Sequence, residues 1–171
     1  DTDGRKALVG HSMGGRLASL YPKLGSSPMS ALVLWSPANG AGLQGLEFLN
    51  INDFSQVEAL AAEAEANGQV ATKWGVEISA AFVQEMRDSD PNAALREAGI
   101  PVLLTYSGKD TVLSEQTISE TIATVQSLPD STVVLDPFVE GDHNYTAEDA
   151  ALSAQLDASL RETTVTFLSN A

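Results

Sequence analysis

The chain has 171 residues, of which 43% are hydrophobic and 19% are charged, values typical of one globular domain with a buried core. It has no cysteine, which excludes disulfides, thiolate metal sites and a cysteine nucleophile. The net charge of −14 argues against a nucleic-acid partner, which needs clustered lysine and arginine, and no apolar run reaches the ~18 residues of a membrane span.

Apolar runs alternate with amphipathic segments along the chain, a pattern that predicts buried parallel strands joined by helices. In chain order, strands are expected at 7–10, 30–37, 100–108 and 131–138. Helices are expected at 13–25, 54–68, 77–88, 90–99, 114–128 and 146–170. Strands that alternate with helices in this way indicate an α/β fold with a parallel sheet.

Residues 41–99 are too long for a simple crossover between two strands. We expect them to form an inserted helical cap, while residues 1–40 and 100–171 form the core. Four side chains are predicted to line a substrate pocket, with ordinary core and lid packing as the alternative for each. These residues are Trp35, Trp74, Phe82 and Met86.

The segment GHSMG, from Gly10 to Gly14, matches the pattern G-x-S-x-G between a predicted strand and a predicted helix. A turn this tight strains the backbone at Ser12 and exposes its hydroxyl. Side chains at Gly10, Gly14 or Gly15 would collide with the neighbouring strand or helix. The N–H of Met13, at the start of the helix, is placed to stabilise an oxyanion. The alternative is a glycine-rich turn with an incidental serine.

A serine nucleophile needs a base, and the chain has two histidines, His11 and His143. His11 adjoins the serine and leaves the turn in another direction, so we expect it to be a packed residue of the turn. His143 follows the fourth predicted strand, and loops at the carboxyl ends of strands hold the sites of open α/β sheets. The alternative for His143 is an ordinary surface residue.

The base needs a carboxylate to orient its ring, and Asp110 follows the third predicted strand in a similar loop. A turn residue or helix cap is the alternative for Asp110. Asp142 and Asp136 are closer to His143 in sequence, but an adjacent aspartate seldom bonds the ring, and Asp136 is a turn former. The order Ser12, Asp110, His143 is that of the α/β-hydrolases.

Three segments carry a resemblance to the α/β-hydrolase superfamily: GHSMGG (10–15), IPVLLTYSGKDTVL (100–113) and EGDHNY (140–145). With LVLWSPA (32–38), they are similar to the serine-aminopeptidase-like, monoacylglycerol-lipase-like and cinnamoyl-esterase-like branches. The resemblance implies Ser12 as nucleophile, Asp110 as acid, His143 as general base and the Met13 N–H as oxyanion donor. It implies no metal and no organic cofactor.

The resemblance also implies that the four strands match the fifth to eighth strands of that fold. We therefore expect the C-terminal half of an α/β-hydrolase, without the N-terminal half that supplies a second oxyanion donor. Residues 7–10 would then form a bare apolar edge, which is an association hazard. We expect this edge to be covered by the N-terminal half as another chain, or by a second copy.

The expected activity is that of a carboxylesterase or lipase-like serine hydrolase, which cleaves esters of small or medium acyl groups through an acyl-enzyme intermediate. Peptidase, thioesterase or amidase action on the same residues is an alternative. A catalytically incomplete fragment that acts as an association module is another. The sequence leaves the compartment open between cytoplasmic and secreted.

Overall fold

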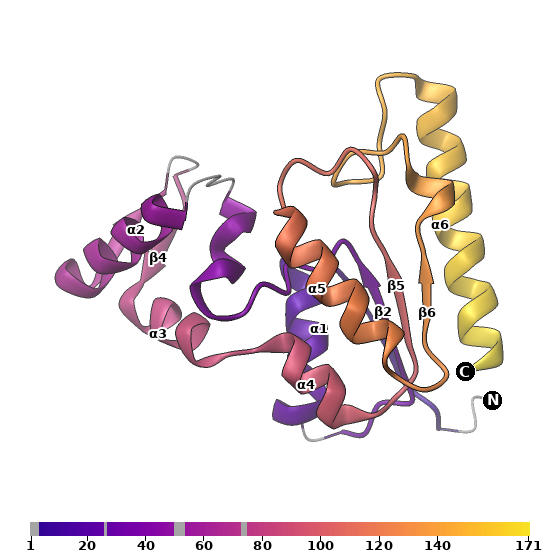
Figure 1. Ribbon diagram of the computed structural model, residues 1–171, viewed down its shortest axis with the longest axis horizontal. Coiled ribbons are helices and arrows are strands. Elements are labelled where there is room, and N and C mark those ends of the chain that lie inside the picture. Colours follow the sequence, from indigo (N-terminus) through magenta and orange to yellow (C-terminus); the bar gives the residue numbers. More distant parts are fainter. Residues whose placement is uncertain (1–3, 26, 50–53, 73–74) are drawn as a thin grey trace.

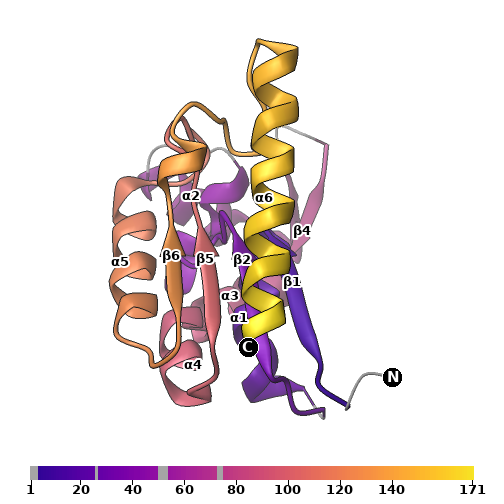
Figure 2. The ribbon, with the colours of Figure 1, turned by 90° about the vertical axis from the view of Figure 1, so that its right-hand side faces the viewer.

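The computed structural model describes residues 4–25, 27–49, 54–72 and 75–171. Its centre is a four-stranded sheet (Figure 1), in which the strands follow the order β1-β2-β5-β6 (Figure 2). The strands are β1 (Ala7–His11), β2 (Ala31–Trp35), β5 (Val102–Thr105) and β6 (Thr132–Val134). All pairings between them are parallel, so the predicted α/β class is confirmed.

Helices cover both faces of this sheet. They are α1 (Met13–Leu24), α4 (Pro91–Ala98) and α5 (Glu115–Gln126) on one face and α6 (Ala150–Asn170) on the other. Leu34 packs in a core with side chains of α1, α4 and α5, whereas the next residue, Trp35, points to the opposite face and packs in a cluster with α6. Figure 2 shows α6 running along the strands in front of β2.

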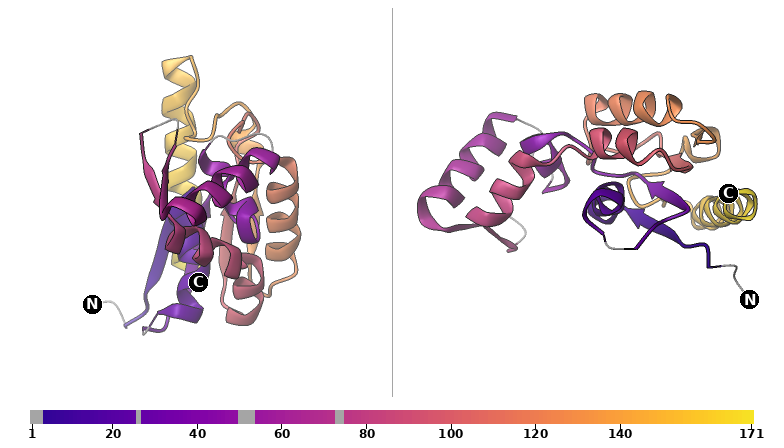
Figure 3. Two further views of the ribbon diagram at one scale, coloured as in Figure 1. Left: turned by 90° about the vertical axis from the view of Figure 1, so that its left-hand side faces the viewer. Right: turned by 90° about the horizontal axis from the view of Figure 1, so that it is seen from below.

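A separate group of elements, the cap segment (residues 42–88), stands beside the core (Figure 3, right). It comprises the 3₁₀ helix η1 (Gly42–Leu49), α2 (Phe54–Asn67), β3 (Gln69–Ala71), β4 (Glu77–Ser79) and α3 (Ala80–Asp88). These elements bury a hydrophobic cluster of their own, distinct from that of the sheet. Helix α4, which also lies in the range 41–99, packs instead with the core through Leu95.

Two sequence predictions within the cap segment are wrong. Residues 77–79 were expected to begin a helix, but they pair with β3 in an antiparallel hairpin. The helix starts at Ala80 because the hydroxyl of Ser79 caps it by accepting from the N–H of Phe82. Residues 42–49, where neither a helix nor a strand was expected, form η1.

The last predicted strand and helix are both shorter than expected. β6 ends at Val134 and is followed by a short 3₁₀ turn, and α6 begins at Ala150 rather than near residue 146. Asp149 caps α6 by accepting from the N–H of Leu152. The loop that contains His143 is therefore longer than predicted, and it crosses the carboxyl ends of the strands. Within the described residues, no helix combines the length and apolar content that crossing a membrane requires.

Candidate active site

Ser12 occupies a sharp turn between β1 and α1, with φ of 53° and ψ of −120°. Such a backbone conformation costs a non-glycine residue about 1–3 kcal/mol and persists only where the surroundings enforce it. Here the N–H of Ser12 donates to the carbonyl of Trp35 at 3.0 Å, and its carbonyl accepts from Arg16 and Ala38. The turn is thus held by β2 and by its own helix, and it holds the serine at the carboxyl end of the sheet.

Two glycines make this turn possible, as the sequence predicts. A Cβ atom on Gly10 would lie 2.6 Å from the carbonyl carbon of Gly14 and 2.8 Å from Cα of Gly15. A Cβ on Gly15 would lie 2.7 Å from Cβ of Pro37. The corresponding expectation for Gly14 is wrong, because no atom lies within 4 Å of a Cβ built there and the residue is exposed at the helix start.

The imidazole of His143 bridges the serine and the aspartate that the sequence singles out. Its Nε2 lies 2.8 Å from Oγ of Ser12, and its Nδ1 lies 2.7 Å from Oδ2 of Asp110. A carboxylate only accepts, so Nδ1–H donates to Asp110 and the lone pair of Nε2 faces the Ser12 hydroxyl. The Asp110 carboxylate is fully buried, which shields this pair from solvent.

Asp110 is held by its own loop. Its Oδ1 accepts from the backbone N–H groups of Val112 and Leu113, at 2.9 and 3.2 Å, which leaves Oδ2 for the imidazole. Asp142, the closer rival in sequence, turns away from the ring. Burial alone would raise the pKa of Asp142, but hydrogen bonds from Thr146 and Asn144 hold it below its ordinary value.

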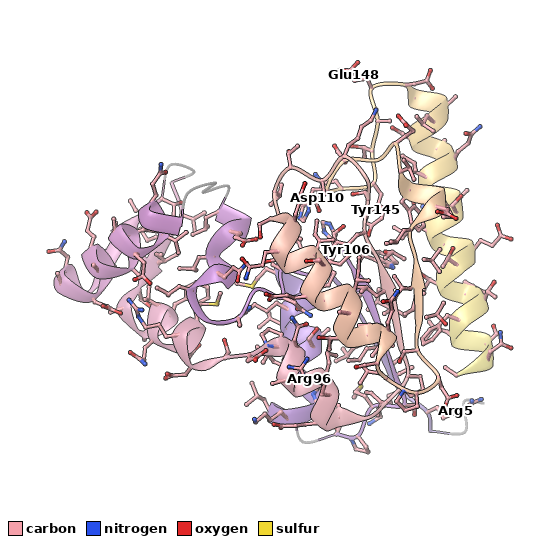
Figure 4. All side chains as sticks on the ribbon, viewed as in Figure 1. Arg5, Arg96, Tyr106, Asp110, Tyr145 and Glu148 are labelled. Carbon is pink, nitrogen blue, oxygen red and sulfur yellow. The ribbon has the colours of Figure 1, made fainter. Side chains whose placement is uncertain are left out.

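Sequence reasoning missed Tyr145, which anchors the histidine loop to the sheet. Its hydroxyl is buried, donates to the carbonyl of Thr105 at 3.0 Å and accepts from Oγ of Ser36 at 3.1 Å. Figure 4 places Tyr145 near Asp110, at the carboxyl end of the strands. Burial raises the pKa of Tyr145 to about 12, so the phenol remains a donor at neutral pH. The one sequence signal for this role is that Tyr145 lies two residues after His143.

His11 is a packed residue of the turn, as expected. It is half-buried, and its Nε2–H donates to the backbone carbonyl of His143 at 2.9 Å, with the two rings 5.0 Å apart. The bond joins the serine turn directly to the histidine loop. Burial is the largest cause that lowers the pKa of His11, and the charge of His143 lowers it further. The bond to the His143 carbonyl and the charge of Asp110 act in the opposite direction.

Replacement of His11 by glutamine is expected to reduce the loss of stability in acid. Because the folded pKa of His11 lies below its unfolded value of about 6.5, the unfolded chain binds more protons as pH falls through this value. Its contribution is therefore fully present above about pH 6.5 and lost below it. Urea unfolding at pH 7.5 and pH 5 should show a smaller decrease for His11→Gln than for the wild type. Equal decreases would contradict this assignment.

The predicted oxyanion donor and the predicted pocket residues do not all lie together in the structure. Met13 is the first residue of α1, where N–H groups have no intrahelical acceptor, and its side chain packs against the cap cluster. Phe82 and Met86 also belong to that cluster. Trp35 faces α6 instead, where its indole N–H donates to Thr164 at 3.3 Å. Trp74 lies outside the described residues.

No protein-family model and no curated protein matches the chain. Solved structures do match in fold. Est1E from Butyrivibrio proteoclasticus, solved with ferulic acid bound, is 17% identical with a TM-score of 0.64; 94% of this chain aligns with 59% of Est1E. Mouse alpha/beta hydrolase domain-containing protein 10 is 21% identical, with a TM-score of 0.60 and coverage of 96% and 64%. An esterase from Exiguobacterium antarcticum is 18% identical, with a TM-score of 0.53 and coverage of 91% and 66%.

These likenesses show the fold. The chain has the architecture of the α/β-hydrolases, as the resemblance in sequence implies, and it spans about 60% of the length of the Butyrivibrio and mouse proteins. The parallel sheet, the flanking helices and the turn that holds Ser12 at its carboxyl end are the parts of that architecture described above.

Proposed function

We propose that the chain is a serine hydrolase that cleaves carboxylic esters. The observation that supports this most directly is the continuous hydrogen-bonded arrangement from Oγ of Ser12 through His143 to Asp110, with distances of 2.8 and 2.7 Å. Each residue follows a different strand of the sheet, and the backbone around each is fixed by hydrogen bonds. Such an arrangement lets a serine hydroxyl transfer its proton while it attacks a carbonyl carbon.

In the proposed reaction, Oγ of Ser12 attacks the ester carbonyl carbon while its proton moves to Nε2 of His143. The N–H of Met13 donates to the oxyanion of the tetrahedral intermediate. Asp110 stabilises the imidazolium and keeps the ring in the tautomer that can accept the proton. The C–O bond to the alcohol then breaks, and the alcohol takes the proton from His143. Water attacks the acyl-enzyme in the same way and releases the acid.

The structural neighbours favour esters as the substrate class. Est1E was solved with ferulic acid, and the Exiguobacterium protein is an esterase. By this analogy of fold alone, a carboxylic ester is the substrate to test first. Thioesters, aminoacyl amides and peptides are cleaved by the same chemistry, so a panel of esters, thioesters and amides with one acyl group separates these activities.

The outer edge of β1 forms part of the same proposal. Within the described residues β1 pairs only with β2, and the edge leaves Val9 46% exposed. Leu17 and Leu24, on α1, are also exposed, at 61% and 76%. An apolar edge with free backbone donors and acceptors pairs readily with another strand. The solved neighbours are longer than the part that aligns with this chain. We propose that further polypeptide covers this edge with an added strand and supplies a second oxyanion donor.

Intact mass spectrometry after treatment with a fluorophosphonate probe tests both parts. The denatured sample should show one adduct on the 18.0 kDa chain, which peptide mapping locates at Ser12. The native sample should show a mass larger than one chain. An absence of adduct in the native assembly would contradict the hydrolase, and a native mass of 18.0 kDa would contradict the covered edge. A native mass of two chains would assign the edge to a second copy.

A further inference from the structure

The buried cation closest in sequence to the nucleophile is Arg16, four residues after Ser12 on α1. Its side chain is only 1% exposed, although arginine is almost never fully buried without a partner. The guanidinium donates from Nη1 to the carbonyls of Gly40 at 2.5 Å and Ala38 at 3.2 Å. It donates from Nη2 to the hydroxyl of Ser89 at 2.7 Å and its carbonyl at 3.4 Å.

The charge of Arg16 is held by neutral oxygens. Burial lowers the pKa of Arg16 to about 10, and the charge of Asp90 opposes this shift at longer range. The side chain is therefore still protonated at neutral pH. A buried charge is costly unless several hydrogen bonds compensate it, so its neighbours must keep their positions for the fold to tolerate it.

The oxygens that surround Arg16 belong to the two stems of the cap segment. Ala38 and Gly40 lie immediately before the cap segment, and Ser89 lies immediately after it. The stems are also joined to each other, because the N–H of Gly42 donates to the carbonyl of Ser89 at 3.0 Å. One side chain of α1 thus fixes both connections between the cap segment and the core.

Helix η1 packs directly on the guanidinium. A Cβ atom on Gly45 would lie 2.6 Å from Cζ of Arg16 and 2.6 Å from Cε of Met86, so a side chain there would have to displace one of these groups. Helix α1 makes a second contact with the cap segment through Met13, whose side chain packs against the hydrophobic cluster of that segment. The residue after the nucleophile and the residue one turn later therefore both contact the cap segment.

A second polar contact joins η1 to the other side of the site. The carboxylate of Glu47 is largely buried and accepts from the N–H of Ser114 at 2.9 Å and from the hydroxyls of Ser114 and Thr117. Ser114 is the N-cap of α5 and follows directly after the loop of Asp110. Helix η1 is thus fixed between α1, which follows Ser12, and α5, which follows the Asp110 loop. A mobile lid would lack such buried polar contacts.

We propose that Arg16 is a positioning residue that holds the cap segment as a fixed wall beside Ser12 and thereby sets the preference for the acyl chain. The inference rests on the proposed function for its link to substrate, and on the contacts of Arg16 for the fixed cap. Loss of these contacts should leave the bonds among Ser12, His143 and Asp110 intact while it frees the cap segment. The effect should therefore fall on KM and on chain-length preference rather than on kcat for a short ester.

The test compares Arg16→Met and Ser89→Ala with Arg87→Met. Arg87 pairs with Glu58 and Glu65 inside the cap segment, so its loss removes an arginine of the cap without touching the stems. Hydrogen exchange is measured on the full chain in its native assembly, together with kcat and KM for p-nitrophenyl acetate and octanoate. Ser89→Ala keeps the guanidinium and its bonds to Ala38 and Gly40, so it provides the answer if Arg16→Met does not fold.

For Arg16→Met we expect exchange in residues 42–88 to accelerate about tenfold or more while β2 and β5 stay protected. The octanoate-to-acetate ratio of kcat/KM should change about fivefold, mainly through KM, and Arg87→Met should change neither quantity. The proposal would be overturned if hydrogen exchange in the cap segment were unchanged in both Arg16→Met and Ser89→Ala. It would also be overturned if exchange accelerated evenly over the sheet. If the wild type shows no turnover, the proposed function fails, and the exchange measurement still decides the role of Arg16.

Discussion

Replacement of Ser12 by alanine is expected to lower kcat for ester hydrolysis about 10⁴-fold or more, because the attacking oxygen is lost. Binding of the ester should persist, since the turn, the cap segment and the helix start do not depend on the hydroxyl. Steady-state kinetics with an activated ester measures the effect. Turnover by Ser12→Ala within tenfold of the wild type would contradict Ser12 as the nucleophile.

Replacement of His143, alone and together with Ser12, tests whether the two side chains act as one unit. Because the serine hydroxyl and the imidazole act as a unit, His143→Ala should cost about as much as Ser12→Ala, and the double variant should cost no more than either. Asp110→Asn should also lose activity, on the order of 10⁴-fold, because an amide favours the wrong imidazole tautomer. Multiplying losses in the double variant would show that the two side chains act independently.

A matched control is available on α6, far along the chain from the turn. Ser169 is exposed, and its hydroxyl donates to the carbonyl of Val165 within the same helix. Ser169→Ala should keep kcat and KM at the wild-type values. Thermal unfolding of all the variants shows whether any loss of activity reflects loss of the fold.

Replacement of Gly10 by alanine is expected to destabilise the fold by about 3 kcal/mol or more, at the upper end of the range for overpacking. The added Cβ would meet the carbonyl carbon of Gly14 at 2.6 Å and Cα of Gly15 at 2.8 Å, which are backbone atoms of the strained turn. Neither can move without displacing Ser12 from His143. For a chain of this size the loss corresponds to a decrease in Tm of about 10 °C.

Gly14→Ala is the contrasting variant, four residues along the chain. No atom lies within 4 Å of a Cβ at Gly14, and alanine is a better helix former than glycine by about 0.5–1 kcal/mol. Its Tm should equal or exceed that of the wild type. Differential scanning calorimetry of the two variants decides the point, and equal destabilisation by both would show that the turn is not the constraint that the structure indicates.

The sequence by itself determined the parallel sheet and the three residues that meet at its edge. Apolar runs such as 31–35 and 102–105 are local signals, and the carboxyl ends of parallel strands share one edge whatever the rest of the fold does. Ser12, Asp110 and His143 each follow such a run, so their meeting could be expected without coordinates. The caps of α4 and α5, at Asp90 and Ser114, are also local and were predictable.

Other features depended on contacts between residues far apart in the chain. Residues 77–79 became a strand because 69–71 lie beside them, and no local pattern contains that partner. Whether a Cβ fits at Gly10 or at Gly14 depends on which backbone atoms lie close to each position in the folded chain. Trp35 faces α6 rather than a substrate because the pleat of β2 points it there.

The tertiary structure also decided the position of Arg16, which the sequence analysis did not single out. Its cation is buried only because Ala38, Gly40 and Ser89 converge on it from both stems of the cap segment. Tyr145 is the equivalent case in the histidine loop, where its hydroxyl reaches the ends of β2 and β5. Short-range patterns identify the candidate residues for the proposed chemistry, whereas long-range packing and hydrogen bonding determine what holds those residues in place.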